Sequence, residues 1–500
     1  MNPSMGFQPV LLWTDLLLFV LIGVALLGAL HARRQPPLRA AWHKVGRRPA
    51  GMAAATVLLV FVALGVLDSL HYRPQLPPLP VLDPGADAAS AAIGSGAEIE
   101  DGEERRRAGA PPAAVYSTEV LSLLDALLAP LRVHTEKTYS APFASTLYQR
   151  EIVQLEDGRQ IRDYPRLAHG SAHLADPEAE RAADIATRML AALGQALLAW
   201  AAVAVLLVGL IRRGNGLGWG ETARALAAGR TVLAWRAALL TLGILVLIAT
   251  LCLHLAPAYH VLGTDKVGQD VLYLALKSVR TALVIGTLTT LVMLPFAVAL
   301  GIAAGYLGGW VDDAVQYTYT VLNAIPGVLL IAAAVLMMQV VIDTHPQWFD
   351  TAAERSDARL LALCLILGIT SWTGLARLLR GETLKLRELE YVQAARAFGV
   401  ATPAILRRHI LPNVMHIVTI ALVMDFSGLV LAEAVLSYVG IGVDPTTISF
   451  GTMINMARAE LAREPMVWWS LAAAFVFMFV LVLAANLFAD VVRDAFDPRR

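Results

Sequence analysis

Runs of apolar residues alternate with polar segments along almost the whole chain. Nine of these runs come close to the roughly 20 residues that cross a bilayer as a helix. They lie at about 10–30, 51–70, 188–211, 235–257, 279–304, 316–342, 359–379, 414–437 and 467–489. The runs are too long and too uninterrupted for barrel strands, and a helix pairs its own backbone groups in lipid. The pattern predicts an all-α polytopic membrane protein with about nine transmembrane helices.

Composition indicates the same class. Of the 500 residues, 57% are hydrophobic and 16% are charged, against about 45–50% and 25% in soluble domains. The net charge is zero, so bulk electrostatics indicates no nucleic-acid partner. Cys252 and Cys364 lie in apolar runs and predict buried thiols rather than a disulfide or metal site. His169 and His173 are spaced as half a metal site, but without a third ligand we expect a solvated pair.

Charged loops orient the predicted spans. Segments 31–49 and 211–230 are rich in Arg and Lys with little acid, which places both in the cytoplasm by the positive-inside rule. Alternation then puts the N-terminus outside, the C-terminus inside and the acidic loop 343–358 outside. Only segment 308–316, placed inside with two aspartates, runs against the charge bias. Met1–Pro9 lacks the basic start of a cleavable signal peptide, so we expect the first span to be retained.

The same alternation exposes residues 71–187 on the outer side. The first part is rich in Pro, Gly and Ala and predicts a flexible linker. Apolar residues then recur at helical spacing through 117–132, with Ser117 or Thr118 as the cap, and 146–164 predicts a hairpin. We expect a small extracytoplasmic α+β insertion that acts as an accessory module.

The polar segment 390–413 predicts two short helices. One face of the first is marked by residues at i, i+3, i+4 and i+7: Tyr391, Ala394, Ala395 and Phe398. Gly399 predicts the helix stop. Thr402 would cap the second helix with Pro403 at its first position, and Pro412 would end it.

Small alanines on such a face allow another protein to approach closely. Arg407, Arg408 and His409 add positive charge to the second helix. Two interpretations follow: a protein-docking element, or an amphipathic loop that lies on anionic headgroups.

The segment QAARAFG, followed by HILP, resembles the EAA loop of ABC-importer permeases, with Gln393 where the motif usually has Glu. VLGTDKVGQDVLYLALKSVRTAL (261–283) is similar to the HxLGTDxxGRD segment of the oligopeptide/dipeptide/nickel permeases, with Gln269 in place of Arg. GYLGGWVDD, NAIPGVLL, LAEAVLSYVGIGVDP and NLFADVVRDAFDPRR resemble successive segments of the same family. The resemblance covers roughly 230–500 and indicates the second of the two permease subunits usual in this family.

The resemblance implies a division of the chain. Two extra N-terminal transmembrane helices would occupy 1–70, the outer domain 71–187, and a third extra helix with a cytoplasmic linker 188–230. A six-helix permease core would occupy 231–500, with the EAA-like loop at 388–413. The residues expected to couple this loop to the ATPase are Tyr391, Gln393, Ala394, Ala395, Phe398, Gly399, Arg407, Arg408 and Pro412.

The implied function is transport of peptides or a similar small solute across a bacterial inner membrane. Implied partners are a second permease subunit, two ABC ATPase subunits and a solute-binding protein, within the membrane lipids. We expect no cofactor and no enzyme activity in the chain itself, because it contains no Gly-Lys dipeptide and hence no GxxxxGK[ST] phosphate loop. Two alternatives remain open: a membrane receptor or assembly factor on a permease scaffold, and an exporter-type or lipid-handling ABC complex.

Ionisable residues inside spans are costly and become functional candidates. Asp425 and Glu433, two turns apart, are candidates for the translocation path; packing inside the bundle is the alternative. Pro295 and Pro326 interrupt predicted core helices and mark bends, either static or moving during transport.

Overall fold

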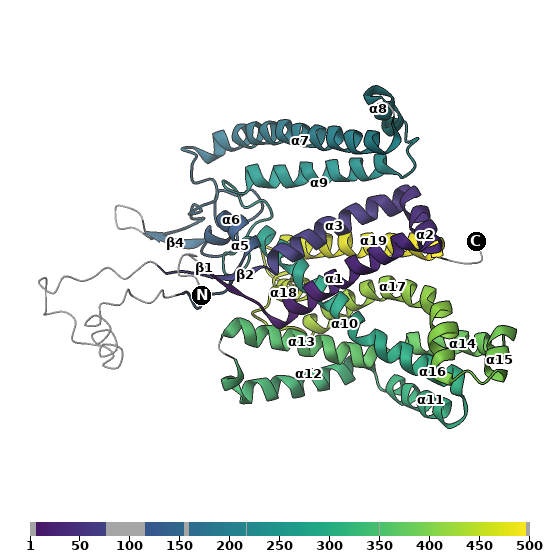
Figure 1. Cartoon of the computed structure of the whole chain (residues 1–500). Helices are drawn as coiled ribbons and strands as arrows, with labels where there is room; N and C mark the ends of the chain where they lie inside the picture. Colours follow the sequence, from purple (N-terminus) through teal and green to yellow (C-terminus); the bar gives the residue numbers. More distant parts are fainter. Residues whose placement is uncertain (1–6, 77–115, 155–159, 217, 350, 497–500) are drawn as a thin grey trace, which may run out of the picture.

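The computed structural model describes residues 7–76, 116–154, 160–216, 218–349 and 351–496, which form a bundle of long helices (Figure 1). Within these residues, nine helical segments are long and apolar enough to cross a membrane. They are α1 (Trp13–Arg34), α3 (Pro49–Asp68), α7 (Pro177–Asn215), α9 (Trp235–Leu255), α10 (Val271–Leu307), α12 (Gly327–Thr344), α13 (Ala352–Ser371) with α14 (Thr373–Arg387), α16 (Thr402–Ile405) with α17 (Leu411–Tyr438), and α19 (Trp469–Phe496). The predicted all-α polytopic fold is confirmed.

The other elements are short. The helices among them are α2 (Pro36–Arg47), α5 (Leu123–Leu127), α6 (Ala129–Val133), α8 (Trp219–Ala227), α11 (Gly309–Ala324), a 3-10 turn (Pro346–Trp348), α15 (Glu390–Ala397) and α18 (Phe450–Glu460). The strands are β1 (Phe7–Val10), β2 (His71–Pro74), β3 (Leu121–Ser122), β4 (Glu151–Gln154) and β5 (Gln160–Asp163). An antiparallel sheet runs in the order β1-β2-β3, and β4 pairs with β5. The first sheet joins the start of the chain to the insertion after α3.

The short elements sort to opposite ends of the bundle (Figure 1). The strands and the helices α5 and α6 gather at one end, whereas α2, α8, α15 and α16 lie at the other. The two Arg-rich segments of the sequence therefore lie at the same end as the EAA-like loop, and the insertion lies at the far end.

The predicted span 316–342 is wrong in its boundaries. The chain instead forms α11, breaks at Ile325 and Pro326, and begins α12 at Gly327. Proline has no N–H to continue the helix and restricts the residue before it. Pro295, by contrast, lies inside the unbroken helix α10.

Helix α10 runs through the centre of the bundle and contributes residues to each of the three large apolar clusters. It approaches α14 closely at two glycines. A Cβ on Gly301 would lie 2.7 Å from the Ala376 carbonyl oxygen, and one on Gly305 would lie 2.7 Å from that of Arg380. These glycines let the two backbones touch, which fixes the position of α14 and of α15 beyond it.

Buried ion pairs attach the N-terminal part of the chain to α10. Lys277 Nζ lies 2.6 Å from Asp68 at the end of α3 and 3.0 Å from Asp125 in α5. One turn further, Arg280 binds Asp15 in α1 at 2.6 Å. All three carboxylates are buried. A charge buried without its partner is strongly destabilising, so α1, α3 and α5 form one structural unit with α10 at this point.

The outer insertion differs in part from expectation. The continuous helix predicted through 117–132 is wrong: the chain forms β3 and two short helices, and Ser122 is the cap, with Asp125 completing a capping box. Leu128, the residue before α6, separates the two helices, and Pro130 lies in the first turn of α6. The hairpin is confirmed by the pairing of β4 with β5. Most of the predicted linker lies outside the described residues.

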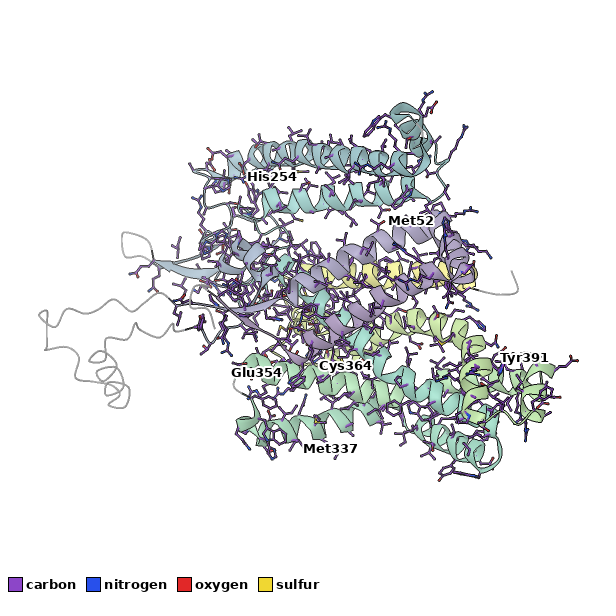
Figure 2. All side chains as sticks on the ribbon, viewed as in Figure 1. Met52, His254, Met337, Glu354, Cys364 and Tyr391 are labelled. Atoms are coloured by element: carbon purple, nitrogen blue, oxygen red, sulfur yellow. The ribbon has the colours of Figure 1, made fainter. Side chains whose placement is uncertain are left out.

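Both cysteines are free; Cys364 is fully buried inside the bundle (Figure 2) and Cys252 is partly buried. His169 and His173 have different partners in this fold. His173 hydrogen-bonds an aspartate of α7, whereas His169 stacks on His134 at 4.8 Å between ring centroids. The described part of the chain holds no group of three or more His, Cys, Asp or Glu arranged to bind a metal.

Candidate functional site

Helix α15 ends in the way its glycine predicts. Phe398 is the C-cap, and Gly399 follows it with φ of +73°. The Val400 N–H donates to the Ala395 carbonyl at 3.1 Å, and the Gly399 N–H donates to Arg396 at 3.0 Å. This pair of bonds is a Schellman motif, which needs a left-handed residue at the position of Gly399.

Buried apolar side chains anchor the segment 390–413 to α10 and α14. Val392 on α15, Ile405 at the end of α16 and Ile410 in the following π-turn are each at most 1% exposed and belong to one apolar cluster with α10 and α14. Ala395 packs against the same cluster. The segment is therefore held rigidly rather than lying loosely on the bundle.

The opposite face projects outward. Tyr391, Ala394 and Phe398 are exposed, and Phe398 is 87% exposed at the tip of the turn. Figure 2 shows Tyr391 at the end of the bundle opposite the strands. Its hydroxyl accepts a hydrogen bond from Asn413 at 3.0 Å, which fixes the ring. An exposed apolar face of this kind is typical of a contact surface.

Three sequence predictions for this segment need correction. Thr402 is the first residue of α16 and Ala401 is the cap, without a side-chain bond. Pro412 does not end the second helix. It lies in the first turn of α17, directly after the π-turn Leu406–Ile410. Helix α16 continues through this π-turn into the membrane helix. Ala395 faces partly inward, so the predicted apolar face is split.

The polar residues of the segment lie on its surface. The Gln393 amide donates to the Glu388 carbonyl at 3.1 Å and folds back along its own turn. Arg407 and Arg408 are exposed in the π-turn, and Arg407 borders a groove of about 360 Å³ between α10 and α16. The segment therefore exposes both an apolar side chain, Phe398, and positive charge, on Arg407 and Arg408.

An ion pair accounts for one of the two aspartates that run against the charge bias. Asp312 in α11 accepts a hydrogen bond from Arg380 of α14 at 2.7 Å. Hydrogen bonding to Arg380 lowers the pKa of the Asp312 carboxyl, against a smaller opposing effect of burial. The charge is neutralised locally, and the pair holds α11 against the helix that leads to α15.

At the other end of the bundle, the LGTD segment joins the start of α10 to the outer insertion. His260 hydrogen-bonds Asp270 through Nδ1 at 2.8 Å and Glu136 of the insertion through Nε2 at 3.3 Å. Asp270 caps α10 by accepting from the Leu272 N–H at 2.8 Å. A Cβ on Gly268 would lie 1.7 Å from the Glu136 carbonyl oxygen, so only glycine fits.

The pKa values of Glu136 and His260 at this junction are strongly shifted. Burial raises the pKa of Glu136, but hydrogen bonds from His260 and three backbone N–H groups outweigh it and bring the pKa to about 2. Burial lowers the pKa of His260, but its two carboxylate partners outweigh that and raise it to about 9. The imidazolium is thus held charged between two carboxylates.

The two acidic residues of α17 have different surroundings. Glu433 is 1% exposed and accepts hydrogen bonds from Ser437 at 2.7 Å and Ser449 at 2.9 Å. It joins α17 to the cap of α18, which is a packing position. Asp425 is half-buried, and among the described residues it has no recorded hydrogen-bond or ion-pair partner.

Comparison with known proteins decides the family. Residues 297–500 match the family described as binding-protein-dependent transport system inner membrane component. The chain is 33% identical over 239 residues to the oligopeptide transport system permease protein OppC of Mycobacterium bovis, covering 48% of this chain and 76% of that protein. The chain belongs to this permease family. It is therefore a membrane subunit of the ABC-importer type.

Two further relatives agree. The permease is 34% identical over 242 residues to the glutathione transport system permease protein GsiD of Pectobacterium atrosepticum, covering 48% of this chain and 73% of that protein. It is 30% identical over 240 residues to the dipeptide transport system permease protein DppC of Lactococcus lactis, covering 48% and 64%. Since each match covers about half of the permease, its N-terminal part is an extension beyond the shared region.

Several functional residues escaped the sequence reasoning. Val392 anchors α15, Arg380 holds α11, and Glu136 completes the junction with His260. Periodicity offered a signal only for Val392, as the buried neighbour of an exposed face. The other two pair with residues at least 68 positions away.

Proposed function

We propose that the permease carries peptides or a similar small solute across the inner membrane, driven by ATP hydrolysis in partner subunits. The rigid, exposed surface around Phe398 supports docking of an ABC ATPase at the end of the bundle that carries α15. The names of its relatives, which transport oligopeptides, dipeptides and glutathione, support the solute class. ATP would be bound by two ATPase subunits, and this chain would hold no cofactor.

The proposed assembly contains a second permease subunit and an extracytoplasmic solute-binding protein. In this arrangement the end with α2, α8 and α15 faces the cytoplasm and the end with the strands faces outward. The first 230 residues form the extension, with the outer domain at 71–187, and the permease core follows from 231. Asp425 is proposed to face the solute path or the second permease, whereas Glu433 supports packing.

The coupling residues are proposed as a set with distinct roles. Tyr391, Ala394 and Phe398 would contact the ATPase directly, while Arg407 and Arg408 would meet acidic groups at its edge. Gln393, Ala395, Gly399 and Pro412 would hold the segment in shape.

The deciding experiment replaces the exposed ring. Phe398→Asp puts a charge at the centre of the apolar surface, so we expect loss of the ATPase from the complex purified with the full chain, and loss of solute-stimulated ATP turnover. Tyr164→Asp, at an exposed aromatic residue of the outer insertion, is the control and should keep the ATPase bound. A Phe398→Asp complex with normal turnover would contradict ATPase docking here and favour a receptor built on the permease scaffold.

A further inference from the structure

Helix α2 lies between the spanning helices α1 and α3 at the end of the bundle that carries α15 (Figure 1). One side is firmly packed: Val45 is buried against Val491 and Val492 of α19, and Trp42 contacts Phe496 edge-on at 5.5 Å. The helix is therefore fixed at the membrane boundary and cannot turn its polar side elsewhere.

The opposite side of α2 and the end of α1 border a groove of about 500 Å³. Five of its eight lining residues are Arg or Lys, namely Arg33, Arg34, Arg39, Lys44 and Arg47; the others are Pro36, Ala40 and His43. The five Arg and Lys side chains are exposed. Among the described residues, none of these five makes an ion pair with a carboxylate, whereas the neighbouring Arg48 pairs with Asp494.

Like charges held this close repel one another, and an anion between them removes the repulsion. An anionic headgroup would reach the groove without leaving the membrane surface. On α1, before the part that borders the groove, three apolar side chains at helical spacing are exposed. They are Val20, Val24 and Leu27, which are 52%, 58% and 67% exposed. A free phosphate would use only the groove, whereas a phospholipid would use the groove for its phosphate and the apolar row for an acyl chain.

We propose that the groove between α1 and α2 binds the phosphate of an anionic phospholipid, with an acyl chain along α1. The site belongs to the N-terminal extension, outside the region shared with the relatives, and it does not depend on the solute or on the ATPase. A basic helix at a membrane surface attracts anionic lipid through each Lys or Arg near the headgroups. Here the groove concentrates that attraction on one bound lipid.

The test measures retention of phosphatidylglycerol against phosphatidylcholine of the same chains on the detergent-purified full chain, by native mass spectrometry. We expect a preference for phosphatidylglycerol that falls roughly tenfold or more in Arg39→Gln/Lys44→Gln/Arg47→Gln. The charge-keeping variant Arg39→Lys/Lys44→Arg/Arg47→Lys should retain it, which separates lost charge from lost folding. Equal retention of the two lipids by the unaltered chain would overturn the proposal.

Two further arms define the source and the place of binding. Arg213→Gln/Arg224→Gln/Arg230→Gln removes three exposed charges near α8 at the same end and should leave the preference unchanged; an equal loss would mean diffuse surface attraction and reject the groove. Millimolar inorganic phosphate should not displace the lipid, because it lacks the chain that lies on α1. Displacement by phosphate alone would assign the groove to free phosphate and overturn the lipid proposal.

Discussion

Gly399 has a left-handed backbone with φ of +73°, and no heavy atom outside its own chain neighbours lies within 4 Å of where its Cβ would be. The penalty for another residue therefore comes from the backbone alone and amounts to about 1–2 kcal/mol. We expect Gly399→Leu to displace α15 relative to α16 and to reduce solute-stimulated ATP turnover. Gly381→Leu in α14 also meets open space but without a left-handed φ, so it should keep turnover. Equal effects of the two variants would assign the loss to added bulk.

His260 and Glu136 predict a pH dependence for the outer junction. The pKa of His260 is raised to about 9, so its contribution to stability is complete below about 6.5 and is lost as pH rises through 9. The pKa of Glu136 is lowered to about 2, so its contribution is present above about 4.5 and is lost as pH falls towards 2.

The contribution of this pair to the midpoint temperature of thermal unfolding should therefore be largest between about pH 4.5 and 6.5. His260→Gln should remove the decline through pH 9, and Glu136→Gln the decline towards pH 2. His173→Gln, on a partly exposed histidine, is the control. An unchanged alkaline decline in His260→Gln would show that another group carries it.

At the scale of elements, one lysine joins three of them. Lys277 of α10 pairs with Asp68 of α3 and Asp125 of α5, and its side chain is 13% exposed. Lys277→Ala would leave two buried carboxylates without their cation, and loss of one partner of such a group lowers the free energy of unfolding by roughly 3–5 kcal/mol. We expect a matching fall in the midpoint of denaturant unfolding.

Lys385→Ala is the matched control. Lys385 is 69% exposed and pairs with Glu382 three residues earlier on the same helix, an interaction with a contribution of about 1 kcal/mol or less. A similar loss in both variants would mean that the buried pairs do not hold α10, α3 and α5 together.

Across the whole molecule, buried ion pairs attach the outer insertion to the permease core. Deletion of 71–187 would remove Asp125 and Glu136, the partners of Lys277 and His260, and two of the three strands of the first sheet. We therefore expect the deletion variant to be degraded or aggregated rather than to assemble with the ATPase. Recovery of a stable, ATPase-bound deletion variant would restore the accessory interpretation.

Topology is tested on the intact chain after Cys252 and Cys364 are replaced by Ala. An impermeant thiol reagent should label Thr118→Cys in intact cells, because the positive-inside rule places that end outside. Ala397→Cys, exposed at the tip of α15, should react only after the membrane is opened. The reverse pattern would invert the proposed orientation.

Local patterns were enough for the parts of this protein that depend on neighbouring residues. Apolar run length predicted the spans because each helix pairs its own backbone in lipid, and Gly399 predicted the helix stop because the left-handed position is local. The hairpin and the basic loops followed in the same way, and the motifs that sit on these elements indicated the permease family.

The tertiary structure decided whatever joins distant positions. Lys277 and Arg280 look like ordinary basic residues of α10 until α1 and α3 place Asp15 and Asp68 beside them, more than 200 residues earlier in the chain. The continuation of α16 into α17, the buried state of Glu433 and the basic groove beside α2 likewise depend on what packs against them. Periodicity describes one helix at a time, whereas burial and charge pairing belong to two or more, and only the assembled bundle determines them.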